Sequence, residues 1–439
     1  MQTCRPTGIS GLAHYAAGLL GGIALVLPVC AIAADYDATP ADYDRLVARL
    51  QPGDRLLLAA GAYLHGLILH AMQGSEAAPI EISGPASGPP AIFLARENHN
   101  TVSIKNSSHL IISNLILDGR NRPVDAVKAE GTSQWAHHIT LQGLLIRNHG
   151  YDQQIVGISV QCPAWHWSIR DNVIIGAGTG IYLGSSDGKL PFVQGAVEGN
   201  VILDTTGYNL QIKHQIKRPS LQGMPESAGA TVIRGNVFSK GRHSSGAAFA
   251  RPNVLIGHLP IATTGSEDRY LIEGNLFLGN PAESLFQGEG NIVLNDNLFL
   301  NPDGNAIAIQ PHKDFPRSVL VTGNLIAAKG LALRLQGVPS GSQLTVEDNE
   351  ILEGVSLQSH MPSMDAKSGG IPLSQLVERW FSRVPAVNLQ RRIREQMLIP
   401  AIQRLCSLPQ DADRLEYYDA LGAARYEMLC RSISVAHRQ

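Results

Sequence analysis

A short stretch in the middle of the chain gathers the residue types that acid–base chemistry requires. Residues 207–219 read GYNLQIKHQIKRP. Leu210 and Ile212 alternate with polar residues, as in a strand with one buried face. The opposite side then carries amines, an imidazole and a guanidinium, which together can bind an anion and transfer protons near neutral pH.

Each ionisable side chain of this stretch can be given a chemical role. Lys213 is the candidate base, because the imidazole and the two cations that follow it are expected to push its pKa toward neutrality. The guanidinium of Arg218 suits two-point binding of a carboxylate. Tyr208 or His214 is the candidate proton donor. The alternative is that this stretch, and Lys217 above all, is only a solvated basic face.

A recurring pattern along the chain predicts the scaffold that carries this strand. A turn pair containing Asn or Gly precedes a few apolar residues at intervals of roughly 20–40 residues, as in a solenoid of stacked coils. Asn and Gly tolerate the left-handed backbone of sharp turns, and stacked Asn side chains can hydrogen-bond from coil to coil. The pattern is found at Asn114, Gly143, Asn172, Asn200, Asn236, Asn275, Asn297, Asn324 and Asn349.

Through this repeat, residues 50–360 resemble the right-handed parallel β-helix superfamily, which has the pectate-lyase-like fold. The predicted fold is therefore an all-β, right-handed parallel β-helix spanning residues 34–365. A short helix beginning near Thr39 is expected at its N-terminal end, and residues 366–439, with apolar spacings of three and four, are expected to form a C-terminal α-helical extension.

Residues 1–33 have the features of a secretory signal peptide. Arg5 precedes an apolar stretch, and the small residues Ala31 and Ala33 suit a cleavage site. We therefore expect a periplasmic or secreted, monomeric protein with no membrane span after cleavage; an uncleaved anchor is the alternative. Only 16% of the residues are charged and the net charge is −2, which gives no sign of nucleic-acid binding.

The cysteines fit an exported protein without a metal motif. Cys406 and Cys430 could pair in an oxidising compartment. Cys162 stands beside a strand and is expected to be a buried, inert small residue.

The two longest intervals of the repeat follow one another between Asn200 and Asn275. Insertions in a solenoid go to loops and commonly build the binding face. The second insertion carries Arg251. These loops predict a cleft beside Lys213.

Stacking the strands in register predicts which side chains share the outer face. In this register Tyr182 and Gln211 are neighbours in one outward column, Lys213 lies between two glycines in the next, and His258 follows His214. The register rests on the inward pairs Ile158/Val160, Ile181/Leu183, Leu210/Ile212 and Val254/Ile256. The residues predicted to bind substrate are Tyr182, Gln211, Lys217, Arg251 and His258.

A cationic cluster on an exported β-helix indicates an acidic polysaccharide as the partner. β-Elimination from a uronate needs a positive group to neutralise the carboxylate, a base for the C5 proton and an acid for the leaving oxygen. Lys, Arg, Tyr and His supply these three functions. Tyr182 is expected to stack on a sugar ring.

The first coils carry a second resemblance. LQPGDRLLLAAGAYLHGLILH and APIEISG are similar to the opening coils of chondroitinase-B-like and alginate-lyase-like polysaccharide lyases. This resemblance implies a catalytic Lys, for which Lys213 is the counterpart, an Arg on a neighbouring coil, and a calcium ion held by carboxylates. Here IKHQ stands in place of an Arg-His-Gly segment, and the nearby carboxylates are Asp152, Asp187 and Asp204.

Three interpretations of function remain open. The first is a lyase-like enzyme that cleaves an acidic glycan by β-elimination. A uronate C5-epimerase would use the same base chemistry, although a DPHD-type segment is absent. A non-catalytic carbohydrate-binding or cell-surface protein would only hold the anion. A polygalacturonase-type glycosidase is disfavoured, since the clustered aspartates that it would need are absent.

Overall fold

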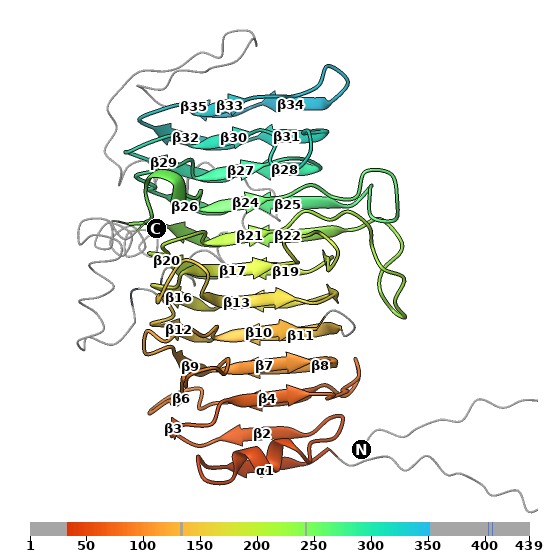
Figure 1. Ribbon diagram of the computed structural model, residues 1–439, viewed down its shortest axis with the longest axis vertical. Coiled ribbons are helices and arrows are strands. Elements are labelled where there is room, and N and C mark those ends of the chain that lie inside the picture. The colour runs from red at the N-terminus through yellow and green to blue at the C-terminus, as the bar shows by residue number, and fades with distance from the viewer. Residues whose placement is uncertain (1–32, 132–134, 242–243, 352–402, 404–405, 407–439) are drawn as a thin grey trace, which may run out of the picture. The chain divides into compact units, whose positions relative to one another are not determined.

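The computed structural model describes residues 33–131, 135–241 and 244–351, together with positions 403 and 406. These ranges consist of short parallel strands, each paired with its counterpart in the next coil, and they form three sheets (Figure 1). The predicted all-β, parallel β-helix fold is therefore confirmed. The predicted signal peptide and C-terminal helical extension lie almost wholly outside the described residues, so both stay predictions. Among the described residues, none forms a helix long and apolar enough to cross a membrane.

Sheet A contains the first strand of each coil, and two short strands pair at its side. Its strands are β1 (Asp35–Ala38), β2 (Arg55–Leu58), β5 (Ile80–Ser83), β8 (Ser107–Ser113), β11 (Ala136–Gln142), β15 (Ser168–Arg170), β19 (Ala196–Glu198), β22 (Ala230–Arg234), β25 (Arg269–Glu273), β28 (Ile292–Asn295), β31 (Ser318–Thr322) and β34 (Gln343–Glu347), with β14 (Ala164–Trp165) and β18 (Phe192–Val193) beside them.

Sheet B contains the strand that follows in each coil after a sharp turn. Its strands are β3 (Gly61–Tyr63), β6 (Ala91–Leu94), β9 (Leu115–Asp118), β12 (Leu145–Arg147), β16 (Val173–Ile175), β20 (Val201–Leu203), β23 (Val237–Ser239), β26 (Leu276–Leu278), β29 (Leu298–Asn301), β32 (Leu325–Ala328) and β35 (Glu350–Ile351).

Sheet C closes each coil before the chain returns to sheet A. Its strands are β4 (Leu67–His70), β7 (Val102–Lys105), β10 (Val127–Glu130), β13 (Val156–Gln161), β17 (Thr179–Leu183), β21 (Leu210–Ile212), β24 (Val254–Ile256), β27 (Phe286–Gly288), β30 (Ile307–Ile309) and β33 (Leu333–Leu335).

The turns from sheet A to sheet B hold a buried asparagine ladder. The Nδ2 group of Asn236 donates to Oδ1 of Asn275 at 3.0 Å, and Asn275 donates in the same way to Asn297 at 2.9 Å. The same bond links each member to the next along the series Asn172, Asn200, Asn236, Asn275, Asn297, Asn324 and Asn349. The left-handed backbone falls on the preceding Gly or Asp, such as Gly274 with φ 60°. The repeated Asn therefore satisfies buried polar groups between coils, and its predecessor makes the turn.

The interior between the sheets is apolar along the stack. Phe277 packs between Phe238 and Phe299, with ring centroids 5.2 and 4.4 Å away. All three side chains are fully buried. Cys162 also lies in this core, so its predicted burial is confirmed, and this burial raises the pKa of its thiol to about 12. Cys406 is disulfide-bonded; Cys430 lies outside the described residues, so their pairing stays a prediction.

A five-residue helix, α1 (Tyr43–Val47), lies at the N-terminal end of the described coils (Figure 1). It begins later than the sequence indicates, because Thr39 uses its hydroxyl to bond the Asp42 carboxylate at 2.7 Å and does not cap the helix. Tyr43 packs edge-on against Tyr63 at a centroid distance of 5.0 Å. The helix thus places an aromatic ring on the first coil.

Candidate active site

The strand register predicted around Lys213 is confirmed. Tyr182 pairs with Gln211, and Gln211 pairs with Leu255 in the next coil. The inward partners are the predicted ones: Ile158 with Ile181, Ile181 with Leu210, Leu210 with Val254, and likewise Val160, Leu183, Ile212 and Ile256. The outer side of sheet C therefore carries Tyr182 and Gln211 as neighbours, with Lys213 just beyond the end of β21.

The glycines on either side of Lys213 leave room for its side chain. A Cβ placed on Gly184 would lie 3.2 Å from Cβ of Lys213, and one on Gly257 would collide with the backbone of His214. Larger residues at these two positions would crowd the lysine from both neighbouring coils. The two glycines thus flank Lys213 as predicted, and they leave room for its backbone and the first carbons of its side chain.

A cleft of about 720 Å³ lies over this part of sheet C. Its floor comes from the outward side chains of β13, β17, β21, β24 and β27, which are Gln161, Tyr182, Gln211, Leu255 and Gln287. One wall is formed by the loops that enter sheet C, with Gln153, Gln154, Tyr208, Ala250, Arg251, Pro252 and Glu283. The opposite wall is formed by the segments that leave sheet C, with Ser186, Lys213, His312 and Lys313.

Lys213 has the environment expected of a base. Burial lowers the pKa of its ammonium group, and the positive charge of Lys313 lowers it further, while Glu289 acts in the opposite direction. The direction is the predicted one, but the causes are burial and a residue from a distant coil. The Lys213 nitrogen also lies 5.6 Å from the centre of the Tyr182 ring, within range of a cation–π interaction.

Two tyrosines keep their protons in the cleft. Burial raises the pKa of Tyr182 to about 12. Burial also raises the pKa of Tyr208, and the nearby Arg251 opposes this shift. Both phenols therefore remain protonated at neutral pH and can donate hydrogen bonds or a proton.

Hydrogen bonds to its backbone carbonyl oxygen hold Arg251 at the edge of the cleft. Its carbonyl oxygen accepts a bond from the buried Lys240 amine at 2.8 Å and another from Asn280 at 2.9 Å. The guanidinium carbon lies 6.0 Å from the centre of the Tyr208 ring, and Nη1 donates to the carbonyl of Ala250 at 2.7 Å. The second insertion thus supplies a positioned cation, as predicted from its length.

A buried carboxylate organises the opposite wall. Glu289 is fully buried, and one of its oxygens accepts the backbone N–H groups of His312 (2.6 Å), Lys313 and Asp314 (2.9 Å). Its other oxygen accepts the N–H of His258 at 2.9 Å. Charge-assisted bonds of this kind hold a loop in one conformation. Glu289 therefore presents Lys313 to the cleft.

His214 and His258 are neighbours, as the register predicts, but they do not line this cleft. Their ring centroids are 5.2 Å apart, and burial is the main cause that lowers the pKa of His214. Nδ1 of His258 lies 2.9 Å from the carbonyl oxygen of Leu259. The two rings therefore contact each other outside the lining of the cleft.

Arg218 and Lys217 are not brought to the cleft. Arg218 is buried and forms an ion pair with Asp268, and its Nη1 donates to the carbonyl of Pro225 at 2.8 Å. Lys217, the preceding residue, is exposed and lies outside the cleft. Arg218 therefore anchors the loop of the first insertion through Pro225. Its guanidinium is already paired with Asp268.

The donor set of this cleft does not fit calcium. Glu283 is the only carboxylate in its lining, and Glu289 already accepts four backbone N–H groups. Calcium takes about six to eight oxygen ligands, usually with several carboxylates. In the described part of the chain, Asp152, Asp187 and Asp204 do not form a cluster that could hold a metal.

Two members of the site could not be found from the local sequence. His312 and Lys313 lie in the loop after β30, on a coil well beyond the two insertions. The sequence gives one indication of this wall, which is the acidic Glu289 directly after β27. The structure shows that this carboxylate is fully buried, and a buried carboxylate must have hydrogen-bond partners. Only the stacking of the coils in the structure reveals that these partners are the backbone N–H groups of the loop after β30.

Comparison with known proteins places the fold. No protein family matches the sequence, and no curated protein is significantly similar to it. Among solved structures, an alginate lyase from Paenibacillus sp. str. FPU-7 is 17% identical, with 71% of this chain and 99% of that chain aligned at a TM-score of 0.53. This similarity agrees with the parallel β-helix fold, and at such identity it extends to the fold alone.

Two further solved structures are less similar. The A-module of the mannuronan C-5 epimerase AlgE6 from Azotobacter vinelandii is 13% identical, covering 73% of this chain and 94% of that chain at a TM-score of 0.46. The GH136 lacto-N-biosidase from Eubacterium ramulus is 12% identical, covering 72% and 68% at a TM-score of 0.40.

Proposed function

We propose that this protein binds an acidic, uronate-containing polysaccharide in the cleft and cleaves it by β-elimination. The observation that carries the proposal is the half-buried Lys213, whose pKa burial lowers, beside the protonated Tyr182 in a cleft that Arg251 and Lys313 also line. Arg251 and Lys313 lie on opposite walls of the cleft. A chain of negatively charged sugars fits between such walls.

The roles of the residues follow from the chemistry. Arg251 and Lys313 neutralise the uronate carboxylate, which makes the C5 proton more acidic. The free amine of Lys213 takes that proton, the C–H electrons form the C4–C5 double bond, and the C4–oxygen bond breaks. The hydroxyl of Tyr208 gives its proton to the leaving oxygen. Afterwards the Lys213 ammonium group releases the C5 proton to solvent, and the Tyr208 phenolate takes a proton from solvent. Tyr182 and Gln211 contact the sugar from the cleft floor.

The first substrate to test is alginate, because the similar solved structure is an alginate lyase. Residues 1–33 resemble a signal peptide, so we propose that the protein acts as a periplasmic or secreted monomer. These features support an extracellular polysaccharide as the partner.

The test measures the ultraviolet absorbance of the unsaturated product with alginate, pectate, chondroitin, heparin and hyaluronan. Wild type is compared with Lys213→Ala and with the matched control Lys217→Ala, which removes an exposed amine outside the cleft. We expect activity on one of these polymers, a loss of about 10²–10⁴-fold in Lys213→Ala, and little change in the control.

The remaining outcomes contradict the proposal in different ways. Conversion of mannuronate to guluronate without chain cleavage, seen by NMR, would indicate a C5-epimerase. Binding of a glycan without either reaction would indicate a carbohydrate-binding protein.

A further inference from the structure

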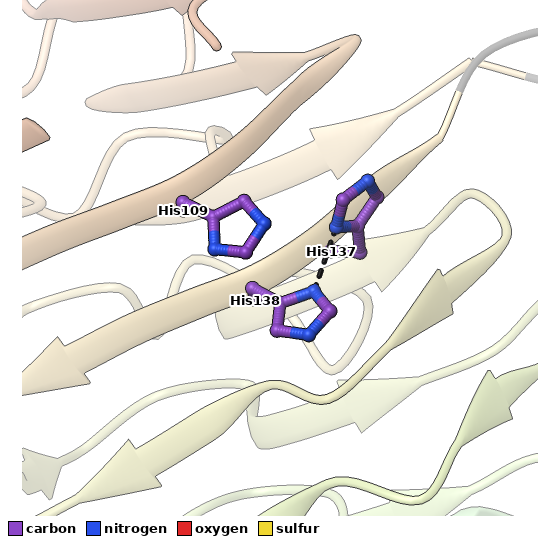
Figure 2. Close-up of side chains that lie close together, drawn as sticks. All are labelled: His109, His137 and His138. Carbon is purple, nitrogen blue, oxygen red and sulfur yellow. Dashed lines mark hydrogen bonds between the residues drawn. The ribbon is translucent and has the colours of Figure 1, made fainter. Parts of the chain in front are cut away.

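A second cluster of chemically capable side chains lies on sheet A, away from the cleft on sheet C. One nitrogen from each of His109, His137 and His138 lies within 4.8 Å of the others (Figure 2). His109 belongs to β8, and the other two belong to β11, the paired strand of the next coil. The group therefore joins two successive coils.

We propose that His109, His137 and His138 form a three-imidazole site for a late first-row divalent metal ion such as Zn²⁺. Imidazole nitrogens are suitable ligands for zinc, copper and nickel. Two nitrogens on one Zn²⁺, each about 2.0–2.1 Å from the ion, lie at most roughly 4 Å apart. The observed spacing is within 4.8 Å, so the nitrogens would have to move closer together to bind an ion. Three imidazoles would leave a fourth position for water.

The backbone orients two of these rings in advance. His109 and His138 both have a left-handed backbone, with φ 53° in each. They stand opposite each other between the backbone pairs Ser108–His137 and Leu110–Ile139. Their rings stack at a centroid distance of 4.4 Å. The parallel ladder thus fixes both side chains on one patch.

The aromatic neighbours orient the third ring. His137 stacks against Trp135 at 4.8 Å and against the buried Trp165 at 4.3 Å. Its Nδ1 faces Nδ1 of His138 at 2.7 Å (Figure 2). A ring packed against two indoles that also contact each other, with centroids 6.1 Å apart, loses little freedom when it binds an ion.

A hydrogen bond to the next coil engages one nitrogen of His138. Nε2 of His138 lies 3.0 Å from Nδ1 of His166 on the next coil. When Nε2 carries the proton, Nδ1 of His138 offers its lone pair toward His137. Metal-bound histidines commonly donate their second N–H in this manner. His166 is therefore the positioning partner of the site.

The imidazoles are neutral at neutral pH. Burial lowers the pKa of His137 to about 3 and that of His138 to about 4, and the neighbouring imidazoles add to both shifts. Burial also lowers the pKa of His109. Neutral rings keep the lone pairs that a metal ion needs.

The experiment uses full-length protein without a polyhistidine tag, stripped of metal with a chelator. Zn²⁺ binding is measured by competition with a chromophoric chelator, and thermal unfolding is measured with and without Zn²⁺. The variants His109→Asn and His138→Asn each remove one ligand with a residue that also tolerates a left-handed backbone. His65→Asn, which changes an exposed histidine elsewhere, is the control.

We expect wild type and His65→Asn to bind one Zn²⁺ and to unfold at a higher temperature in its presence. Each ligand variant should bind at least about 100-fold more weakly, and His166→Asn about 10–100-fold more weakly. Absence of binding by wild type would mean that the cluster is only a hydrogen-bonded stack of imidazoles. Unchanged binding by both ligand variants would place the ion elsewhere. Either result overturns the proposal.

Discussion

At the scale of single residues, the amine of Lys213 owes its altered basicity to the coils around it. Burial and the charge of Lys313 both lower its pKa. Sequence neighbours were expected to do this, but Arg218 is neutralised by Asp268 and Lys217 points into solvent. Proximity along a strand was thus a poor guide to proximity in space.

The pH dependence of the reaction tests this environment. In the proposed mechanism Lys213 acts as a free amine, so kcat/KM should rise as the pH passes upward through its pKa. Lys313→Ala removes a positive charge that lowers this pKa, so the pKa should rise and the limb should move to higher pH. Lys217→Ala should leave the limb in place. An unshifted limb in Lys313→Ala would show that the charge of Lys313 does not influence the pKa of the catalytic base.

The structural role of Arg218 can be tested by stability. Arg218→Met leaves the buried Asp268 without its ion-pair partner, which typically costs about 3–5 kcal/mol. Urea unfolding should show this loss, while kcat of the folded protein stays near that of wild type. A loss of kcat at unchanged stability would return Arg218 to the substrate-binding role that its sequence position indicates.

At the scale of elements, the cleft depends on loops more than on strands. The strand register over β17, β21 and β24 could be predicted, because one buried face fixes it and a slip of one residue would expose the core. The cleft wall around Lys313 could not be predicted. Glu289 and the loop that carries Lys313 come near Lys213 only because later coils stack on its own. Loop folding depends on such long-range partners, which no local pattern encodes.

Glu289→Gln tests whether this carboxylate positions the wall. The substitution keeps the shape but removes the charge that accepts four N–H groups, so we expect a stability loss of about 1–3 kcal/mol. Because Lys313 then loses its fixed position, KM for the glycan should rise. Denaturant unfolding and steady-state kinetics measure both effects. Glu347→Gln, an exposed change on sheet A, is the control; equal behaviour of the two variants would refute the positioning role.

At the scale of the whole molecule, a solenoid separates its scaffold from its chemistry. The Asn ladder and the apolar interior recur in coil after coil, which is why a repeat pattern was enough to predict the fold. The cleft arises where the second insertion and a buried carboxylate interrupt that repetition. Function is therefore encoded in the exceptions to the repeat, and these have the weakest sequence signal.

The most direct test of the central claim compares wild type with Lys213→Arg. Arginine keeps the positive charge and so retains glycan binding, but its guanidinium does not lose a proton and cannot act as the base. We predict that wild type forms the unsaturated product from an acidic polysaccharide, and that Lys213→Arg binds the same polymer but forms the product about 10²–10⁴-fold more slowly. Product formation by Lys213→Arg at the wild-type rate would contradict the account.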